Sequence, residues 1–216
     1  MQLLAFNGSP RKKKWNTATL LEHVVAGAQS AGAQAECIQL YDLNFSGCIS
    51  CFSCKRRNRK QNGVCAVQDE LTPLLDRIHN IDALVIGSPV YFGTETASTR
   101  AFLERLMYPF MNFDDRGKTY FPRSIPTGMI YTMNIPESRF AELGYGPQFE
   151  KTRTYLAHVF GSCEMLLSTD TLQHTNYDTY EYGMFDKDAK AKRHEDVFPQ
   201  DCQHAYNLGR RLVTNT

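Results

Sequence analysis

Short apolar runs and helical stripes alternate along the whole chain. Between the runs, apolar positions recur with a helical period, as in Leu20, Leu21, Val24, Val25 and Ala28. The run at 83–87 has no polar side chain, which is typical of a parallel strand buried on both faces. The pattern predicts strands at 2–6, 35–41, 83–87, 125–132 and 165–168. It predicts helices from 16 to a cap at Gly32 and at 71–78, 96–108, 148–160 and 201–213.

This order of elements predicts the α/β class. Five strands that alternate with helices imply right-handed crossovers and a doubly wound parallel sheet with helices on both faces. The flavodoxin-like strand order 2-1-3-4-5 is the natural candidate, and its ligands bind at the switch point between strands one and three. We expect one domain over residues 1–216, with a cysteine-rich loop at 46–68 and an irregular segment at 170–199 that is rich in aromatic residues.

Composition excludes several other classes of protein. The chain is 42% hydrophobic and 22% charged, an ordinary globular mixture, and its net charge of +1 gives no general attraction to nucleic acid. Its apolar runs are far shorter than the roughly 20 residues that cross a bilayer, and its first residues do not resemble a signal peptide. The six histidines suggest no hydrolytic site. We therefore expect a cytoplasmic protein with no membrane or nucleic-acid partner, and we assign no catalytic residue.

The loop after the first strand has the features of a phosphate site. It runs Asn7-Gly8-Ser9-Pro10-Arg11-Lys12-Lys13-Lys14-Trp15-Asn16-Thr17 into the first helix, whose N-terminus offers unpaired N–H groups to an anion. Ser9, Asn16 and Thr17 add short donors, and Arg11 can bind two phosphate oxygens at once. The loop matches neither the P-loop nor the G-x-G-x-x-G pattern. The alternative is a helix capped by Asn16 or Thr17 behind a solvated basic loop.

A second loop follows the third strand, on the other side of the expected switch point. Its sequence is Gly87-Ser88-Pro89-Val90-Tyr91-Phe92-Gly93-Thr94. Two adjacent aromatic residues at the end of a parallel strand favour contact with a flat ring, and core packing of both side chains is the alternative. Together the two loops predict a site for a phosphate-bearing aromatic cofactor.

With the cysteine loop between them, these two motifs resemble the NAD(P)H-dependent FMN reductase family, and most of all its iron–sulfur flavoprotein branch. The resemblance implies FMN and a nicotinamide donor. It implies a phosphate held by Ser9, Arg11, Asn16 and Thr17, with Lys13 of the same loop among the cofactor-binding residues. It implies an isoalloxazine ring beside Pro89, Val90, Tyr91, Phe92 and Gly93. The loop after strand four, with Thr132, Met133 and Asn134, should close the site.

Four of the seven cysteines fall within eighteen residues, as Cys48, Cys51, Cys54 and Cys65. Thiolates in a C-x₂-C-x₂-C run with a distant fourth can hold a [4Fe–4S] cluster. Redox-active or packing thiols are the alternative, and zinc fits less well because no histidine lies close to this run. The intervening basic run, Lys55 to Lys60, departs from the compact pattern of the iron–sulfur branch. Because the loop leaves strand two, we expect it beside the phosphate loop and close to FMN.

The sequence therefore predicts an FMN-dependent oxidoreductase. We expect electrons from NAD(P)H or a reduced carrier to pass to a quinone, a small oxidant or a redox protein, and we expect a homodimer or homotetramer. A flavodoxin-like electron-transfer protein without its own substrate is the alternative. The basic run is either a solvated loop, a docking site for an acidic carrier, or a grip on the extra phosphate of NADPH.

Overall fold

The computed structural model describes residues 1–58 and 61–214. The strands are β1 (Gln2–Asn7), β2 (Gln34–Gln39), β3 (Ala83–Tyr91), β4 (Thr94–Glu95), β5 (Ile125–Thr132) and β6 (Gly161–Ser168). The helices are α1 (Asn16–Ser30), α2 (Thr72–Ile78), α3 (Ala97–Met107), α4 (Phe140–Leu143), α5 (Tyr145–Phe160), α6 (Lys187–Asp196) and α7 (Phe198–Thr214). Within these residues, no helix combines the length and the apolar character needed to cross a bilayer.

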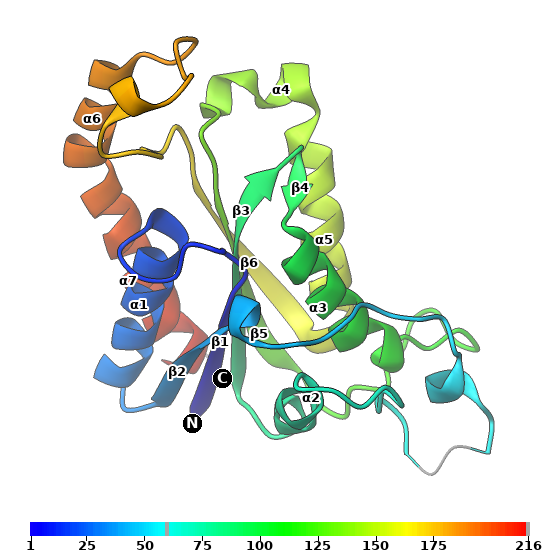
Figure 1. The fold of residues 1–216 in the computed structure, drawn as a ribbon. Coiled ribbons are helices and arrows are strands. Elements are labelled where there is room, and N and C mark those ends of the chain that lie inside the picture. The colour runs from blue at the N-terminus through cyan, green and yellow to red at the C-terminus, as the bar shows by residue number, and fades with distance from the viewer. Residues whose placement is uncertain (59–60, 215–216) are drawn as a thin grey trace.

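The sheet has the predicted doubly wound order. Its main path runs β2-β1-β3-β5-β6, which is the expected 2-1-3-4-5 arrangement, and every neighbouring pair on this path is parallel. Strand β1 lies between β2 and β3, so the order reverses there. The carboxyl ends of β1 and β3 are therefore the switch point at which ligands bind in such sheets. Figure 1 shows helices on both faces of the sheet.

Each face of the sheet buries its own hydrophobic core. In β1, Leu4 and Phe6 face one core while Leu3 and Ala5 face the other, because successive side chains of a strand point to opposite sides. Helices α3 and α5 cover the first core, and α1 and α7 cover the second (Figure 1). All four of these strand residues have no exposed surface. That residues 1–216 form a single domain stays a prediction.

Helices α1 and α7 approach each other at two glycines. A Cβ on Gly27 of α1 would lie 2.0 Å from the carbonyl oxygen of Tyr206, and a Cβ on Gly209 of α7 would lie 2.0 Å from the carbonyl oxygen of Val24. Neither position has room for a side chain. The two glycines thus let the helix backbones touch, and this contact fixes α7, near the end of the chain, against the helix that starts the ligand site.

Strand β3 is longer than predicted. Ser88 and Pro89 continue the parallel ladder opposite Tyr131 and Thr132 of β5, where the sequence predicts a loop. Val90 and Tyr91 then pair with β4 in a hairpin whose two turn residues, Phe92 and Gly93, both have positive φ, 52° and 82°. Positive φ at both central residues is the geometry of a type I′ turn, which usually takes Asn or Gly. Because Phe is rare in that conformation, the sequence did not indicate the hairpin.

Helix α6 lies inside the segment that we expected to be irregular. Its sequence, KDAKAKRHED, carries no apolar stripe, so a search for hydrophobic periodicity cannot find it. Its signals are electrostatic instead. The side chain of Asp186 caps the helix by accepting hydrogen bonds from the backbone N–H groups of Asp188 and Ala189, and basic residues occupy the last turn.

Candidate functional site

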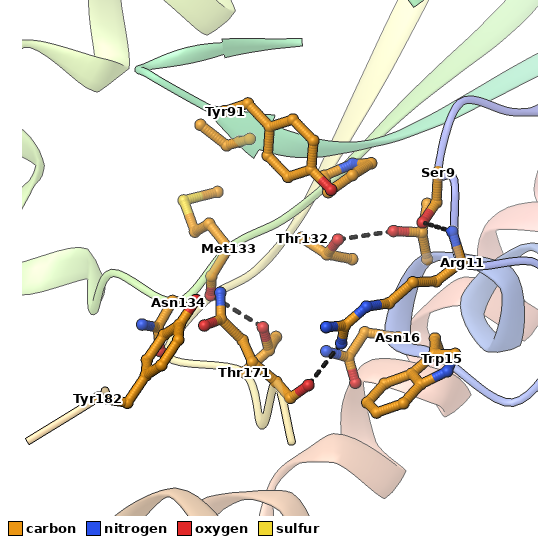
Figure 2. Close-up of a pocket in the computed structure, with 14 residues that line it drawn as sticks. Ser9, Arg11, Trp15, Asn16, Tyr91, Thr132, Met133, Asn134, Thr171 and Tyr182 are labelled. Carbon is orange, nitrogen blue, oxygen red and sulfur yellow. Dashed lines mark hydrogen bonds between the residues drawn. The ribbon is translucent and has the colours of Figure 1, made fainter. Parts of the chain in front are cut away.

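A cavity of about 300 Å³ opens at the carboxyl edge of the sheet (Figure 2). Four segments form its walls: the loop after β1 with the start of α1, the end of β3, the loop after β5, and the segment after β6. It lies at the predicted switch point. The residues that line it are Ser9, Arg11, Trp15, Asn16, Thr17, Pro89, Val90, Tyr91, Thr132, Met133, Asn134, Thr171, Gln173 and Tyr182.

The loop after β1 is held tightly against the end of β3. The backbone N–H of Gly8 donates to the carbonyl of Gly87 at 2.8 Å, and the hydroxyl of Thr96 donates to the carbonyl of Gly8 at 2.7 Å. A Cβ on Gly8 would lie 1.8 Å from the Thr99 hydroxyl oxygen, so only glycine fits there. Within the loop, the hydroxyl oxygen of Ser9 accepts from the backbone N–H of Arg11 at 3.2 Å. These contacts place the loop without using its outward-facing donors.

Helix α1 begins without a side-chain cap. Trp15 stands at the N-cap position, and no side chain accepts a hydrogen bond from the first turn. The alternative reading, in which Asn16 or Thr17 caps the helix, therefore does not hold: the Asn16 amide donates to the carbonyl of Leu172 at 2.9 Å, and the Thr17 hydroxyl bonds the Thr132 hydroxyl at 2.7 Å. Trp15, Asn16 and Thr17 line the cavity, so the positive end of the α1 dipole lies beside it and favours an anion there.

Arg11 supplies the positive charge of this corner. Its guanidinium lies 4.2 Å from the centroid of the Trp15 ring, and it donates a hydrogen bond to the backbone carbonyl of Gln173. The side chain thus spans from the loop after β1 to the segment after β6. Because a guanidinium carries five N–H donors, the others are available to an anion in the cavity, which Arg11 lines.

The hairpin β3–β4 forms a second wall. Tyr91 is half-exposed and lines the cavity, while Phe92 at the tip of the turn is fully exposed and points away from it. Behind the hairpin lies the buried carboxylate of Glu95, which accepts hydrogen bonds from Tyr131 and, at 2.7 Å each, from Thr94 and Thr152. Burial alone would raise the pKa of Glu95, but these hydrogen bonds outweigh it and hold the pKa below its usual value. A charged carboxylate thus fixes the hairpin to β5 and α5.

The remaining walls come from the loop after β5 and the segment after β6. The two run side by side: the N–H of Met133 donates to the carbonyl of Ser168 at 3.0 Å, and the N–H of Thr171 donates to the carbonyl of Met133 at 2.9 Å. This pairing continues the contact of the two parallel strands past their ends. It brings Asn134 and Gln173 to the same side of the cavity.

Ten of the thirteen residues predicted for the cofactor site, Asn134 of the closing loop included, line this one cavity. Lys13, Phe92 and Gly93 do not: Lys13 is exposed in the loop, and the tight hairpin turn directs Phe92 and Gly93 away. The prediction missed Trp15, Thr171, Gln173 and Tyr182. The last three follow the carboxyl end of β6, so the rule that ligands bind at the carboxyl ends of parallel strands could have indicated that segment.

The four clustered cysteines line a second pocket, elsewhere on the molecule. Cys48, Cys51, Cys54 and Cys65 share it with Glu104, Arg105 and Tyr108 at the end of α3. The pocket that they line together with neighbouring residues has a volume of about 10 Å³, room for a single water. Within 1–58 and 61–214, no three histidine, cysteine or acidic side chains are arranged to hold a metal ion.

Arg105 closes the cysteine loop at both of its ends. Its buried guanidinium donates to the Ser46 carbonyl at 3.0 Å, to the Val67 carbonyl at 3.1 Å and to the carboxylate of Asp69 at 2.7 Å. Its Nε also donates to the Cys65 sulfur at 3.1 Å. Burial opposes ionisation of Asp69, but the adjacent guanidinium holds its pKa below the usual value. Arg105 therefore fixes both the path of the loop and one of its thiols.

The expected closeness of the cysteines to the phosphate loop is wrong. The start of α3 touches the phosphate loop through Thr96, whereas Glu104 and Arg105, which hold the cysteines, lie about nine residues farther along, roughly 13 Å at 1.5 Å per residue. In Figure 1 the segment after β2 crosses toward the far end of α3. The chain after β2 thus leaves the carboxyl edge before the first cysteine.

The basic run begins with an anchored side chain. Lys55 donates to the carbonyls of Pro109 and Met111 at 3.2 and 2.6 Å, and its ammonium lies 4.9 Å from the centroid of the Tyr108 ring and 5.2 Å from that of Phe113. Its charge therefore serves to fix the loop to the residues after α3. Positions 59 and 60 of the run lie outside the described residues.

Comparison with known proteins gives a family for the chain. The NADPH-dependent FMN reductase family matches residues 1–125, more than half of the sequence. The chain belongs to this family. The matched stretch carries the loop after β1 and the whole of β3 and β4, but it ends at the first residue of β5. The family therefore accounts for two walls of the cavity, and the other two lie beyond the match.

Curated relatives point to the same part of the family. The chain is 34% identical over 123 residues to an iron-sulfur flavoprotein of Archaeoglobus fulgidus, a match that covers 56% of this chain and 57% of that protein. It is 30% identical over 118 residues to an iron-sulfur flavoprotein of Methanocaldococcus jannaschii, covering 55% and 58%. The chain thus spans about half the length of the curated relatives it matches.

Solved structures extend the likeness of fold to the whole chain. An NAD(P)H:quinone oxidoreductase from Methanothermobacter marburgensis superposes with a TM-score of 0.70 at 17% identity, covering 98% of this chain and 96% of that one. An azoreductase from Bacillus anthracis superposes with a TM-score of 0.64 at 13% identity, covering 97% and 99%. At these identities the likeness concerns the fold alone, and it agrees with the predicted flavodoxin-like class.

Proposed function

We propose that the cavity at the switch point binds FMN and that the chain transfers electrons from NAD(P)H to a quinone, a small oxidant or a redox protein. The uncapped start of α1 beside Arg11 carries this proposal, because it is a site for a single terminal phosphate within a family of FMN reductases. The donor set fits the group. Asn134, which lines the cavity, has a buried amide oxygen that accepts no hydrogen bond from the described residues and that a ligand donor would satisfy.

The chain's own residues have distinct roles in this proposal. The first N–H groups of α1 and the guanidinium of Arg11 bind the phosphate, and the end of β3 with Tyr91 forms a wall for the ring. Glu95 positions that wall through its hydrogen bonds to β5 and α5. When bound, FMN supplies the hydride and one-electron chemistry. Half-exposed Tyr91 stands at the edge of the cavity, where a nicotinamide or an acceptor would approach.

Identification of the cofactor tests the proposal first. Heat should release FMN from purified or reconstituted protein, identified by its mass, whereas FAD or the absence of any flavin would contradict it. Steady oxidation of NADPH or NADH with a benzoquinone acceptor then separates the enzyme from the second candidate, an electron-transfer protein without its own substrate. That protein would bind FMN but turn over slowly with both nicotinamides.

We also propose that the four cysteines bind a [4Fe–4S] cluster. The support is that they share one pocket, that Arg105 donates a hydrogen bond to the Cys65 sulfur, and that the curated relatives are named iron-sulfur flavoproteins. Anaerobic protein reconstituted with iron and sulfide should contain both, and Cys51→Ser should lose both while FMN stays bound. Cys163→Ser, which alters a buried cysteine outside the loop, is the control. Homo-oligomeric assembly and cytoplasmic location stay predictions.

A further inference from the structure

The segment after β6 forms a wall of the cavity that the family match does not include. Thr171, Gln173 and Tyr182 line the cavity, and all three lie beyond residue 125. In Figure 2, Tyr91 and Tyr182 stand on opposite sides of the part of the cavity nearest Met133 and Asn134, away from Arg11 and Trp15. The cavity therefore has a basic end at α1 and an end bounded by two tyrosines.

Two amide oxygens of the described part of the chain lack a partner here, one in the loop after β5 and one in the segment after β6. Among the described residues, the Asn134 Oδ1 and Gln173 Oε1 atoms are buried and accept no hydrogen bond. Both side chains line the cavity, and Asn134 is only 9% exposed. A buried polar atom without a partner is costly, so such atoms in a native protein indicate a missing ligand or water. Two such acceptors, on the adjoining segments after β5 and β6, fit a ligand that offers N–H or O–H donors once each amide turns toward the cavity.

The segment is held rigidly in place. The ammonium of Lys190, itself buried, donates to the Asn134 carbonyl at 2.6 Å and pairs with Asp170. The N–H of Gln173 donates to the Tyr177 hydroxyl at 2.9 Å, and Arg11 donates to the carbonyl of Gln173. Helix α6 and the phosphate loop thus both position this wall.

We propose that this segment is the second half of the flavin site. Tyr182 packs against the isoalloxazine ring on the side opposite Tyr91, and the amides of Asn134 and Gln173 accept hydrogen bonds from the N–H and hydroxyl donors of the flavin. The inference rests on the proposed function, because it requires FMN in this cavity. It assigns flavin affinity to residues outside the part of the chain that matches the family.

Two substitutions test the wall, with a control from the same segment. Tyr182→Ala removes the ring from the cavity and Gln173→Ala removes one amide. Tyr180→Ala is the matched control, since both tyrosines pack on His174, at 4.0 and 4.7 Å between ring centroids, but only Tyr182 lines the cavity. Binding of FMN and of riboflavin, which lacks the phosphate, is measured by quenching of flavin fluorescence.

We expect Tyr182→Ala to weaken FMN binding about tenfold or more, as the loss of an aromatic ring that stacks on a base does. We expect Gln173→Ala to weaken FMN binding about fivefold or more. The affinity for riboflavin should fall by the same factors, because neither side chain contacts the phosphate. Tyr180→Ala should bind as the unaltered protein does. If Tyr182→Ala does not fold, judged by its thermal transition, Gln173→Ala alone decides.

Three outcomes would overturn the inference. Wild-type affinity in both cavity variants would place the flavin away from this wall and leave the proposed function intact. An equal loss of FMN affinity in Tyr180→Ala would show that the affinity depends on the aromatic packing around His174 and not on contact with the flavin. No FMN binding by the unaltered protein would refute the proposed function and this inference together.

Discussion

Replacing Arg105 with methionine should strongly destabilise the protein. Arg105 is 1% exposed, and its guanidinium satisfies the Asp69 carboxylate and the carbonyls of Ser46 and Val67. Methionine keeps much of the packing volume but leaves a mostly buried carboxylate and two carbonyls without their donor. Removing one partner of a buried ion pair costs about 3–5 kcal/mol. For a chain of this length, about 2–4 °C per kcal/mol gives a fall in Tm of roughly 6–20 °C.

The measurement is thermal and urea unfolding of the metal-free protein. Arg153→Met is the control, because Arg153 forms an ion pair with Glu150 on the exposed face of α5 and its loss should change Tm little. The double variant Arg105→Met with Asp69→Leu should recover the part of the loss due to the unpaired charge. It should not recover the part due to the two carbonyls.

The pH dependence of the difference in Tm between the unaltered protein and Arg105→Met gives a second check. The pKa of Asp69 lies below its usual value in the folded protein, so this pair stabilises the fold above about pH 4 and less as the pH falls through the folded pKa. Without Arg105, burial favours the protonated carboxyl, so the variant regains stability as acid is added. The gap in Tm between the two proteins should therefore begin to narrow above about pH 4 and narrow further as the pH falls through the lowered pKa of Asp69 in the unaltered protein. A loss smaller than about 1 kcal/mol, or a gap that stays constant with pH, would refute this account of the pair.

Three further predictions concern the cavity, the helix crossing and the thiols. Arg11→Ala should weaken FMN binding by about tenfold to a hundredfold, since it removes a charge-assisted hydrogen bond. It should weaken riboflavin binding far less. Equal losses of affinity in fluorescence titrations would place the phosphate elsewhere. Gly209→Ala should lower the free energy of unfolding by about 1–3 kcal/mol because its Cβ meets the backbone of α1. Gly146→Ala is the control, because a Cβ there has no atom of the described residues within 4 Å. Similar urea midpoints for the two variants would contradict this. Cys51 is exposed and its pKa is lowered by a hydrogen bond from the Ser53 backbone, so it should react with iodoacetamide before Cys37, whose pKa burial raises to about 12. Peptide mass mapping at neutral pH checks this, and the reverse order would contradict it.

The sheet and two walls of the cavity could be predicted because their signals are local. Buried parallel strands appear as apolar runs, and the first loop joins such a run to a helix, so Ser9 and Arg11 could be placed at the switch point from sequence alone. The hairpin turn could not, since Phe92 adopts a conformation that its residue type disfavours. The tertiary contacts of β4 and β5 through Glu95 hold it there.

The parts that the sequence did not predict depend on contacts between distant segments. Tyr182 reaches the cavity because α6 is fixed by Lys190 to Asp170 and to the loop after β5, and an ion pair twenty residues apart leaves no periodic pattern. The cysteine loop was misplaced for the same kind of reason. Its path is set by Arg105, on a helix forty residues after Cys65. Strand order alone gives the edge from which a loop leaves and not the place where it ends.

The close crossing of α1 and α7 has a consequence for how the chain can be divided. A fragment that ends at residue 125 contains the family match but lacks β5, β6 and α7. In such a fragment Leu20, Leu21 and Val24 of α1, which have no exposed surface in the full chain, would lose the helix that covers them, and β3 would become an exposed apolar edge. We expect it to aggregate on expression. The stretch that matches the family would then be shorter than the smallest fragment able to fold. The family match would cover only part of the unit that folds together.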